Sequence, residues 1–133
     1  MKSLIAALML LGLFAAPAHA AKEYDPSKVL YLELRPSLVG NYGEGPRPRF
    51  YKADVALRVT GTFGLARLEY HQPLIRNELI MLFAAVPAGG MDSLEDKERL
   101  RQAALERVRA AIEYEEGYPL VEDLLFTNLI VQP

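Results

Sequence analysis

The chain has 133 residues, contains no cysteine, and carries 15 lysines and arginines against 17 acidic residues, giving a formal net charge of −2. The lack of cysteine excludes disulfides, thiolate metal sites and cysteine nucleophiles. The faintly acidic balance argues against nucleic acid as a partner, because phosphate binding requires a clustered basic surface. Hydrophobic residues make up 51% of the chain, which is enough for one folded domain and too much for a disordered one.

The first twenty residues have the features of an export signal. Lys2 precedes an uncharged run over residues 4–16, and a proline and small residues follow up to Ala20. This order predicts a secretory signal peptide cleaved between Ala20 and Ala21. The uncharged run would rise only about 20 Å as a helix, against roughly 30 Å for a bilayer core, and an uncleaved short membrane anchor is the alternative. The predicted division is a signal peptide or anchor over 1–20, a short lead over 21–28 and a periplasmic domain over 29–133.

Two stretches of the exported chain alternate with a period of two, which predicts half-buried strands. In residues 29–39 the inward positions are leucines, and Pro36 marks an edge position or a break in pairing. Residues 40–48 are dense in turn formers, and alternation resumes at Tyr51 and runs to Val59. We therefore expect the two strands to pair antiparallel across the loop. The predicted inward residues are Leu30, Leu32, Leu34, Tyr51, Ala53, Val55, Leu57 and Val59.

The period then changes to that of a helix. Residues 61–64 are predicted to end the second strand, and Pro73 suits the first turn of a helix that residues 87–90 would stop. Ser93 begins a capping-box pattern, and a second helix is predicted from there to about Tyr114. The apolar stripe of the first helix consists of Ile75, Leu79, Leu82, Phe83 and Val86, and Leu74, Ile80 and Met81 are predicted to widen it. The apolar stripe of the second helix consists of Leu100, Ala104, Val108, Ala111 and Ile112.

The chain ends in a short apolar run over residues 124–131, nearly free of charge, which predicts a strand buried on both faces. The predicted order is therefore β-β-α-α-β. This order favours an α+β fold in which two helices cover one face of a three-stranded, mainly antiparallel sheet.

Residues able to carry catalysis are sparse. After export His71 is the only histidine, and no serine or aspartate stands at a spacing typical of a triad, so we expect a structural or solvated role. Glu113, Glu115 and Glu116 form the densest acidic group, which is typical of a solvated helix end. A small hydrolase using His71 or this acidic group is a competing hypothesis, because paired carboxylates suit glycosidase chemistry. Our prediction is no catalytic site, no cofactor, no metal site and no small-molecule substrate.

One loop has the composition of a contact site. Arg47 and Arg49 alternate with prolines and precede Phe50, so the loop would present two arginines and an aromatic ring in a stiff setting. The alternative is a stiff connector whose arginines are merely solvated. Tyr31, on the outer side of the first strand, and the nearby Tyr42 are further candidates for a partner interface.

Several segments of the chain, taken in order, resemble flagellar basal-body-associated FliL proteins. The C-terminal run Val121–Gln132 is similar to the valine-rich strand that ends those proteins, with its "F-T" pair at Phe126-Thr127. Residues 73–83 (PLIRNELIMLF) match the family's "P-x-I-R-D-x-I-I-x-L-L" helix, with Asn77 in place of the usual aspartate. Residues 31–41 and 49–57 are similar to the family's first two strands, and Leu100-Arg101 falls on its "L-R" helix, without the family's glycine.

The resemblance implies a fold similar to the stomatin-like (SPFH-type) domain and a tendency to form ring-like oligomers. It further implies a non-enzymatic accessory protein of the flagellar basal body, at the outer face of the inner membrane. Family members associate with the motor's stator units and support flagellar rotation, swimming, swarming and chemotaxis. Family members also carry a transmembrane helix before this domain, and the predicted cleavable signal departs from that pattern. A soluble periplasmic adaptor with a non-flagellar partner is therefore the alternative.

Overall fold

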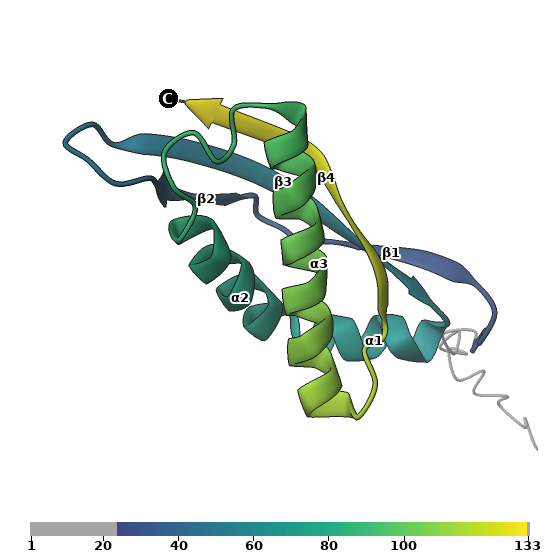
Figure 1. Ribbon diagram of the computed structural model, residues 1–133. Helices are drawn as coiled ribbons and strands as arrows, with labels where there is room; N and C mark the ends of the chain where they lie inside the picture. Colours follow the sequence, from purple (N-terminus) through teal and green to yellow (C-terminus); the bar gives the residue numbers. More distant parts are fainter. Residues whose placement is uncertain (1–23, 133) are drawn as a thin grey trace, which may run out of the picture.

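The computed structural model describes residues 24–132, and seven elements follow one another within them (Figure 1). In chain order they are β1 (Val29–Glu33), β2 (Leu38–Tyr42), β3 (Arg49–Thr60), α1 (Thr62–Tyr70), α2 (Gln72–Ala84), α3 (Leu94–Glu116) and β4 (Val121–Gln132). The predicted α+β class is confirmed, with one strand and one helix more than expected. The predicted signal peptide, with its cleavage site between Ala20 and Ala21, lies outside the described residues.

The long strand β3 is the centre of an antiparallel sheet. β1 and β2 pair with it end to end along one edge, β1 opposite residues 56–60 and β2 opposite residues 49–53. β4 pairs along the other edge, from Phe50 to Val59. The sheet therefore has four strands but is only three strands wide at any point. The buried residues of the three helices share one core with alternate residues of β3, so the helices cover a single face of the sheet (Figure 1).

The prediction of one strand over residues 29–39 is wrong, because the chain forms two strands there. Leu34 makes the last backbone hydrogen bond before the break, its N–H donating to the Val55 carbonyl at 2.9 Å. Pro36, joined to Arg35 by a cis peptide bond, has no N–H with which to continue the ladder. Arg76 of α2 instead donates to the Pro36 carbonyl at 2.7 Å. Pro36 thus marks the predicted break in pairing.

Helix α1 was not expected, because Gly61, which precedes it, and Gly64, within it, read as turn formers. It begins directly after β3 and buries only Gly64 and Leu68, so its apolar pattern is weak. Gly64 lies against β3, where an added Cβ would come within 2.8 Å of Val59 Cγ2. The glycine therefore allows the helix to approach the sheet closely rather than forming a turn.

Helices α2 and α3 supply most of the helical side of the core. In α2 the buried residues are Ile75, Leu79 and Phe83, and the ring of Phe83 stacks on Tyr51 of β3 with 4.4 Å between centroids. The prediction that Ile80 and Met81 widen this stripe is wrong, since they are 43% and 42% exposed. They project away from the sheet because α2 lies at the surface and buries only one stripe.

Helix α3 has the predicted start and a longer course than predicted. The capping box is present: the Asp96 N–H donates to Ser93 Oγ at 3.0 Å, and the Ser93 N–H donates to the Asp96 carboxylate at 3.2 Å. The helix ends at Glu116, where Gly117 adopts a left-handed conformation with φ of 87°. The buried stripe consists of Leu100, Ala104, Val108 and Ile112.

The prediction that the last strand is buried on both faces is also wrong. Within residues 24–132, β4 pairs with β3 alone and is an edge strand of twelve residues. Leu124 is fully buried against the helices, whereas Leu125 and Ile130, which face the other way, are 36% and 53% exposed. A run of apolar residues in sequence therefore does not mean two covered faces here, because the helices cover only one.

Candidate interaction surface

The face of the sheet that points away from the helices carries large apolar side chains in contact with solvent. They lie on the same face because five of them pair with even-numbered residues of β3 and the sixth is itself an even-numbered residue of β3. The odd-numbered residues 51–59 face the core. We call the following six residues the outer patch: Val29, Tyr31, Val39, Phe50, Leu125 and Ile130. Each is more than a third exposed.

The centre of the outer patch forms a shallow apolar depression. Val39 of β2 and Ile130 of β4 both pair with Lys52 of β3, so the two side chains flank the central strand. Together with Phe50 they line a pocket of about 300 Å³. Such a depression suits a partner segment with an apolar side chain beside an acidic one. The apolar side chain would fill the depression, and the acidic side chain would pair with Lys52.

Two of the five predicted interface residues belong to the outer patch, and Tyr42 and the two arginines do not. Tyr31 and Phe50 are 53% and 45% exposed on this face. Tyr42 was expected beside Tyr31, but it pairs with Arg49 on the core face and is only 2% exposed. Its hydroxyl has no hydrogen-bond partner among the described residues, and burial raises the pKa of Tyr42. Simple alternation explains the difference, because an odd-numbered and an even-numbered residue lie on opposite faces and the break at Pro36 leaves this alternation unchanged.

The two predicted arginines lie on the hairpin that joins β2 to β3. Arg47 is exposed, and Arg49 is half-buried with its guanidinium donating to the Glu44 carbonyl at 3.3 Å. Arg49 thus closes its own loop, and Arg47 is the more accessible of the two.

Sequence reasoning missed Val29, Val39, Leu125 and Ile130. Val39 is odd-numbered like Tyr31, so the alternation over residues 29–39 was a signal that could have found it. Leu125 and Ile130 were hidden because an uninterrupted apolar run does not show which side chains the helices leave uncovered. The alternation of buried and exposed positions along β4 appears only once its neighbours are known.

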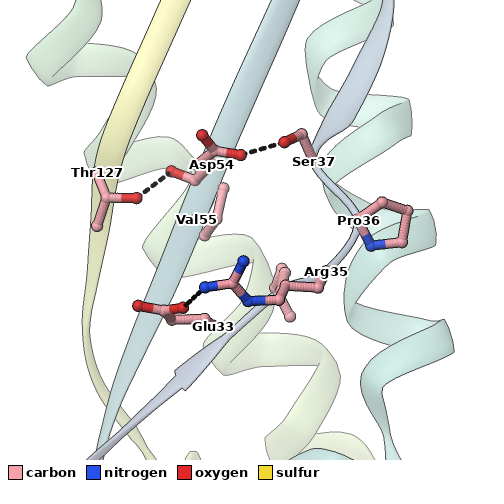
Figure 2. A pocket seen from close by; sticks show the side chains of 8 residues that line it. Glu33, Arg35, Pro36, Ser37, Asp54, Val55 and Thr127 are labelled. Atoms are coloured by element: carbon pink, nitrogen blue, oxygen red, sulfur yellow. Dashed lines mark hydrogen bonds and ion pairs between the residues drawn. The ribbon is translucent and has the colours of Figure 1, made fainter.

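A polar pocket of about 430 Å³ opens where β1 gives way to β2 (Figure 2). Arg35 forms an ion pair with Glu33, and the Ser37 hydroxyl donates to the Asp54 carboxylate, which lowers the pKa of Asp54. The Thr127 hydroxyl donates to the Asp54 carbonyl at 3.3 Å. Each charged side chain named here already has a partner within the pocket. The arrangement therefore stabilises the chain at the break between β1 and β2 and offers no free reactive group.

Two of the residues weighed as catalytic candidates, His71 and Glu116, hold helices together in a contact that we call the clasp. Glu116 Oε1, at the end of α3, lies 2.7 Å from His71 Nε2 and 2.6 Å from Arg67 Nε. The hydrogen bond from Arg67, and then that from His71, hold the pKa of Glu116 below its ordinary value. Glu113 and Glu115 are exposed and lie outside this contact. The clasp joins the α1–α2 junction to the C-terminal end of α3, which is a structural role.

Two negative findings concern the part of the chain from residue 24 to residue 132. No cluster of three or more histidine and acidic side chains in it is placed to hold a metal ion. None of its helices combines the length and apolar character needed to cross a bilayer.

The comparisons with known proteins agree with an interaction module. The family described as "Flagellar basal body-associated protein FliL" matches residues 31–132, which is most of the chain. Curated protein sequences give no match. Because FliL proteins are non-enzymatic accessory proteins, the hydrolase hypothesis for His71 and the Glu113–Glu116 group is set aside. The chain belongs to the FliL family, and its role is that of a flagellar basal-body-associated protein in motility.

Proposed function

We propose that this domain works in the periplasm at the flagellar motor, where it contacts the stator units through the outer patch and supports their active state. The observation that carries the proposal is the row of exposed apolar side chains across the four strands of the uncovered sheet face. The centre of this surface, where Val39, Phe50 and Ile130 line one depression, is typical of a protein contact, because soluble monomers seldom expose contiguous apolar areas. Family membership supplies the setting, the basal body.

The proposed action is a shift between two states of the stator. A binding protein favours one state only by the difference between its affinities for the two states. Moving an equilibrium from 1:99 to 99:1 takes about 5.5 kcal/mol in total. If several copies bind around one stator, the total difference in binding free energy is shared among them. Each contact surface then needs to contribute only a fraction of that free energy. Ring-like self-association and a likeness to the stomatin fold, both implied by the family resemblance, belong to this proposal.

Export is part of the same proposal. We propose that residues 1–20 direct the chain to the periplasm and are removed between Ala20 and Ala21, the uncleaved anchor being the alternative. Intact-mass measurement on the cellular protein separates the two. A chain that begins at Ala21 supports cleavage, and a chain that begins at Met1 supports the anchor.

Complementation of a deletion strain tests the contact. Phe50→Asp places a charge in the outer patch, and Tyr114→Asp is the matched control, since Tyr114 is 88% exposed on α3, on the helical side of the sheet. Soft-agar spreading, filament number and protein level are measured for each variant. We expect Phe50→Asp to reduce spreading to the level of the deletion while filaments still assemble, and Tyr114→Asp to spread like the wild type.

Two results would count against the proposal. Normal spreading of the deletion strain would point to the adaptor with a non-flagellar partner. Equal spreading of the two variants would remove the outer patch from the contact. A photoreactive residue in place of Val39 identifies the partner directly, and the periplasmic part of the stator is the expected crosslink.

A further inference from the structure

Both edges of the sheet carry backbone groups that no neighbouring strand uses, and the directions of the groups in β3 show which they are. The Val55 carbonyl accepts from the Leu34 N–H on the side of β1 and β2, whereas the Asp54 carbonyl accepts from the Thr127 hydroxyl on the side of β4. Backbone groups of successive residues in a strand point to opposite sides. Over residues 50–58 the odd-numbered residues of β3 therefore bond toward β1 and β2, and the even-numbered residues bond toward β4.

Two residues of β2 and two of β4 consequently direct their N–H and C=O groups away from β3. Val39 and Asn41 face even-numbered residues of β3, which bond toward β4. Leu129 and Val131 face odd-numbered residues of β3, which bond toward β2. Within residues 24–132 these outward groups have no hydrogen-bond partner. Each edge therefore offers free donors and acceptors to a further strand.

These two free stretches lie at the same end of the sheet. β2 lies opposite residues 49–53 of β3, and the C-terminal half of β4 runs beside the same residues on the other side (Figure 1). Neither stretch carries a charge or a proline, since residues 38–42 read LVGNY and residues 125–131 read LFTNLIV. Edge segments of this composition readily pair with another strand.

The other end of the sheet is less suited to pairing. Tyr31 of β1 also directs its backbone groups outward, but β1 ends in the exposed Glu33. Asp123 of β4 lies level with Tyr31, because both pair with the same residue of β3. Beside it, the Leu124 carbonyl accepts from Arg101 of α3 at 3.1 Å. Charges on an edge and bonds that cover it disfavour pairing with another chain.

We propose that β2 of one copy pairs in parallel with β4 of the next copy, with Val39 beside Ile130, so that copies follow one another head to tail. β2 and β4 both run antiparallel to β3, so copies placed side by side in one orientation bring these two strands together in parallel. In this register the Val39 N–H donates to the Leu129 carbonyl of the next copy, and the Val39 carbonyl accepts from the Val131 N–H of that copy. The pairing rests on the self-association that belongs to the proposed function, and it assigns the surfaces that make it.

Side chains and backbone groups agree on this register. Val39 and Ile130 are 66% and 53% exposed on the face of the sheet that the helices leave uncovered, and the pairing places them in apolar contact there. A shift by one residue would place Val39 beside a side chain that points toward the helices. The same shift would separate the outward groups of β2 from those of β4.

The register also fixes the direction in which copies are added. Val39 and Ile130 of one chain both pair with Lys52, so each new copy is displaced across the strands and not along them. A head-to-tail interface closes into a ring when the rotation between copies completes a circle, and otherwise it forms an open filament. A repeat without displacement along the strands suits a ring whose axis is parallel to them. The outer patches of successive copies then form a continuous band on one side of the assembly.

Pairs of introduced cysteines test the register in the full, exported chain, which has no cysteine of its own. Within one chain the central strand separates positions 39 and 130 by roughly 10 Å, whereas a disulfide joins Cα atoms up to about 7 Å apart. The double variant Val39→Cys with Ile130→Cys is therefore expected to form a ladder of disulfide-linked multimers, and each single variant is expected to stay uncrosslinked. Tyr31→Cys with Ile130→Cys is the matched control. Tyr31 lies on the same edge and the same face as Val39, and this pair should give no ladder.

Proline substitution gives a second measurement, by sedimentation equilibrium from about 1 to 100 μM. Asn41→Pro and Val131→Pro each remove an outward N–H that the pairing uses, without removing a hydrogen bond to β3. Each variant alone should associate at least about tenfold more weakly than the wild type. An equimolar mixture should form heterodimers with the affinity of the wild-type contact, because one variant keeps β4 intact and the other keeps β2 intact. Circular dichroism establishes that each variant is folded.

The pairing is overturned if the cysteines at positions 39 and 130 give no multimers, if the control with Tyr31→Cys gives the same ladder, or if mixing the two proline variants restores no association. Wild-type oligomers that form without a crosslink between positions 39 and 130 overturn this pairing and leave the self-association of the proposed function standing. A wild type that is monomeric at every concentration overturns both. The stator contact is separate from these outcomes, because Phe50→Asp tests it by motility.

Discussion

Replacing Gly64 of α1 by alanine should have two opposite effects on the free energy of unfolding. Alanine in a helix interior is favoured over glycine by about 0.5–1 kcal/mol. The new Cβ, however, would lie 2.8 Å from Val59 Cγ2, well inside the optimum carbon–carbon separation of about 3.5 Å. Val59 is fully buried and its branched side chain is stiff, so it has little room to move. Overpacking of this kind costs about 1–3 kcal/mol, and Gly64→Ala should therefore lower the free energy of unfolding by about 1 kcal/mol.

The same substitution should change sign when Val59 is shortened. Val59→Ala removes the obstructing methyl group, and Gly64→Ala in that background should raise the free energy of unfolding by about 0.5–1 kcal/mol. Urea unfolding of the four chains, wild type, both single variants and the double variant, measures the coupling between the two sites. Ala66→Gly, at an exposed position of α1, calibrates the helix preference of this segment and should cost about 0.5–1 kcal/mol.

The reasoning is refuted if Gly64→Ala stabilises the wild type and the Val59→Ala chain equally. In that case the close approach of α1 to β3 would not be what the glycine provides. An unchanged dependence of the unfolding free energy on urea across the series is required for the comparison.

Three further predictions concern other parts of the fold. Gly40→Ala brings a Cβ within 2.9 Å of Tyr51 Oη and should cost about 1–2 kcal/mol in urea unfolding, and an unchanged midpoint would show that the ring shifts freely. Ser93→Ala removes the cap of α3 and should cost about 1 kcal/mol, whereas Ser93→Asp should keep most of the stability. Because the pKa of Glu116 is lowered on folding, its stabilisation is complete above the ordinary value of 4.5 and is lost as pH falls through the lowered one. Glu116→Gln should flatten the unfolding profile in that acidic range, and a profile of unchanged slope would contradict the clasp.

What the sequence predicts well here is the periodic part of the chain. Alternation placed the inward residues of β3 correctly from Tyr51 to Val59, and the helical stripe of α3 and its capping box were found as expected. These features depend on local spacing and local hydrogen bonds, which a sequence records directly.

The errors arose where a neighbour decides the outcome. Gly64 read as a turn former because the contact with Val59 that requires it is not visible in the local sequence. The exposure of Ile130 depends on which face of β4 the helices cover. His71 and Glu116, weighed separately in the sequence, meet only because α3 returns to the α1–α2 junction. Periodicity carries no information on contacts between residues that are far apart in the sequence.

The position of β3 at the centre of the sheet also bears on how the chain reaches its final form. Its partner β4 is the last element in chain order, so Phe50 cannot pair with Gln132 until the end of β4 is present. The pairings of β3 with β1 and β2 can form earlier. Contacts between such distant parts of a chain slow folding, because a long loop must close first. Under the export proposed above, the sheet would stay incomplete until residue 132 has crossed the membrane. A stop codon a few positions early would for the same reason leave the first residues of β3, from Phe50 to Lys52, without their β4 partners.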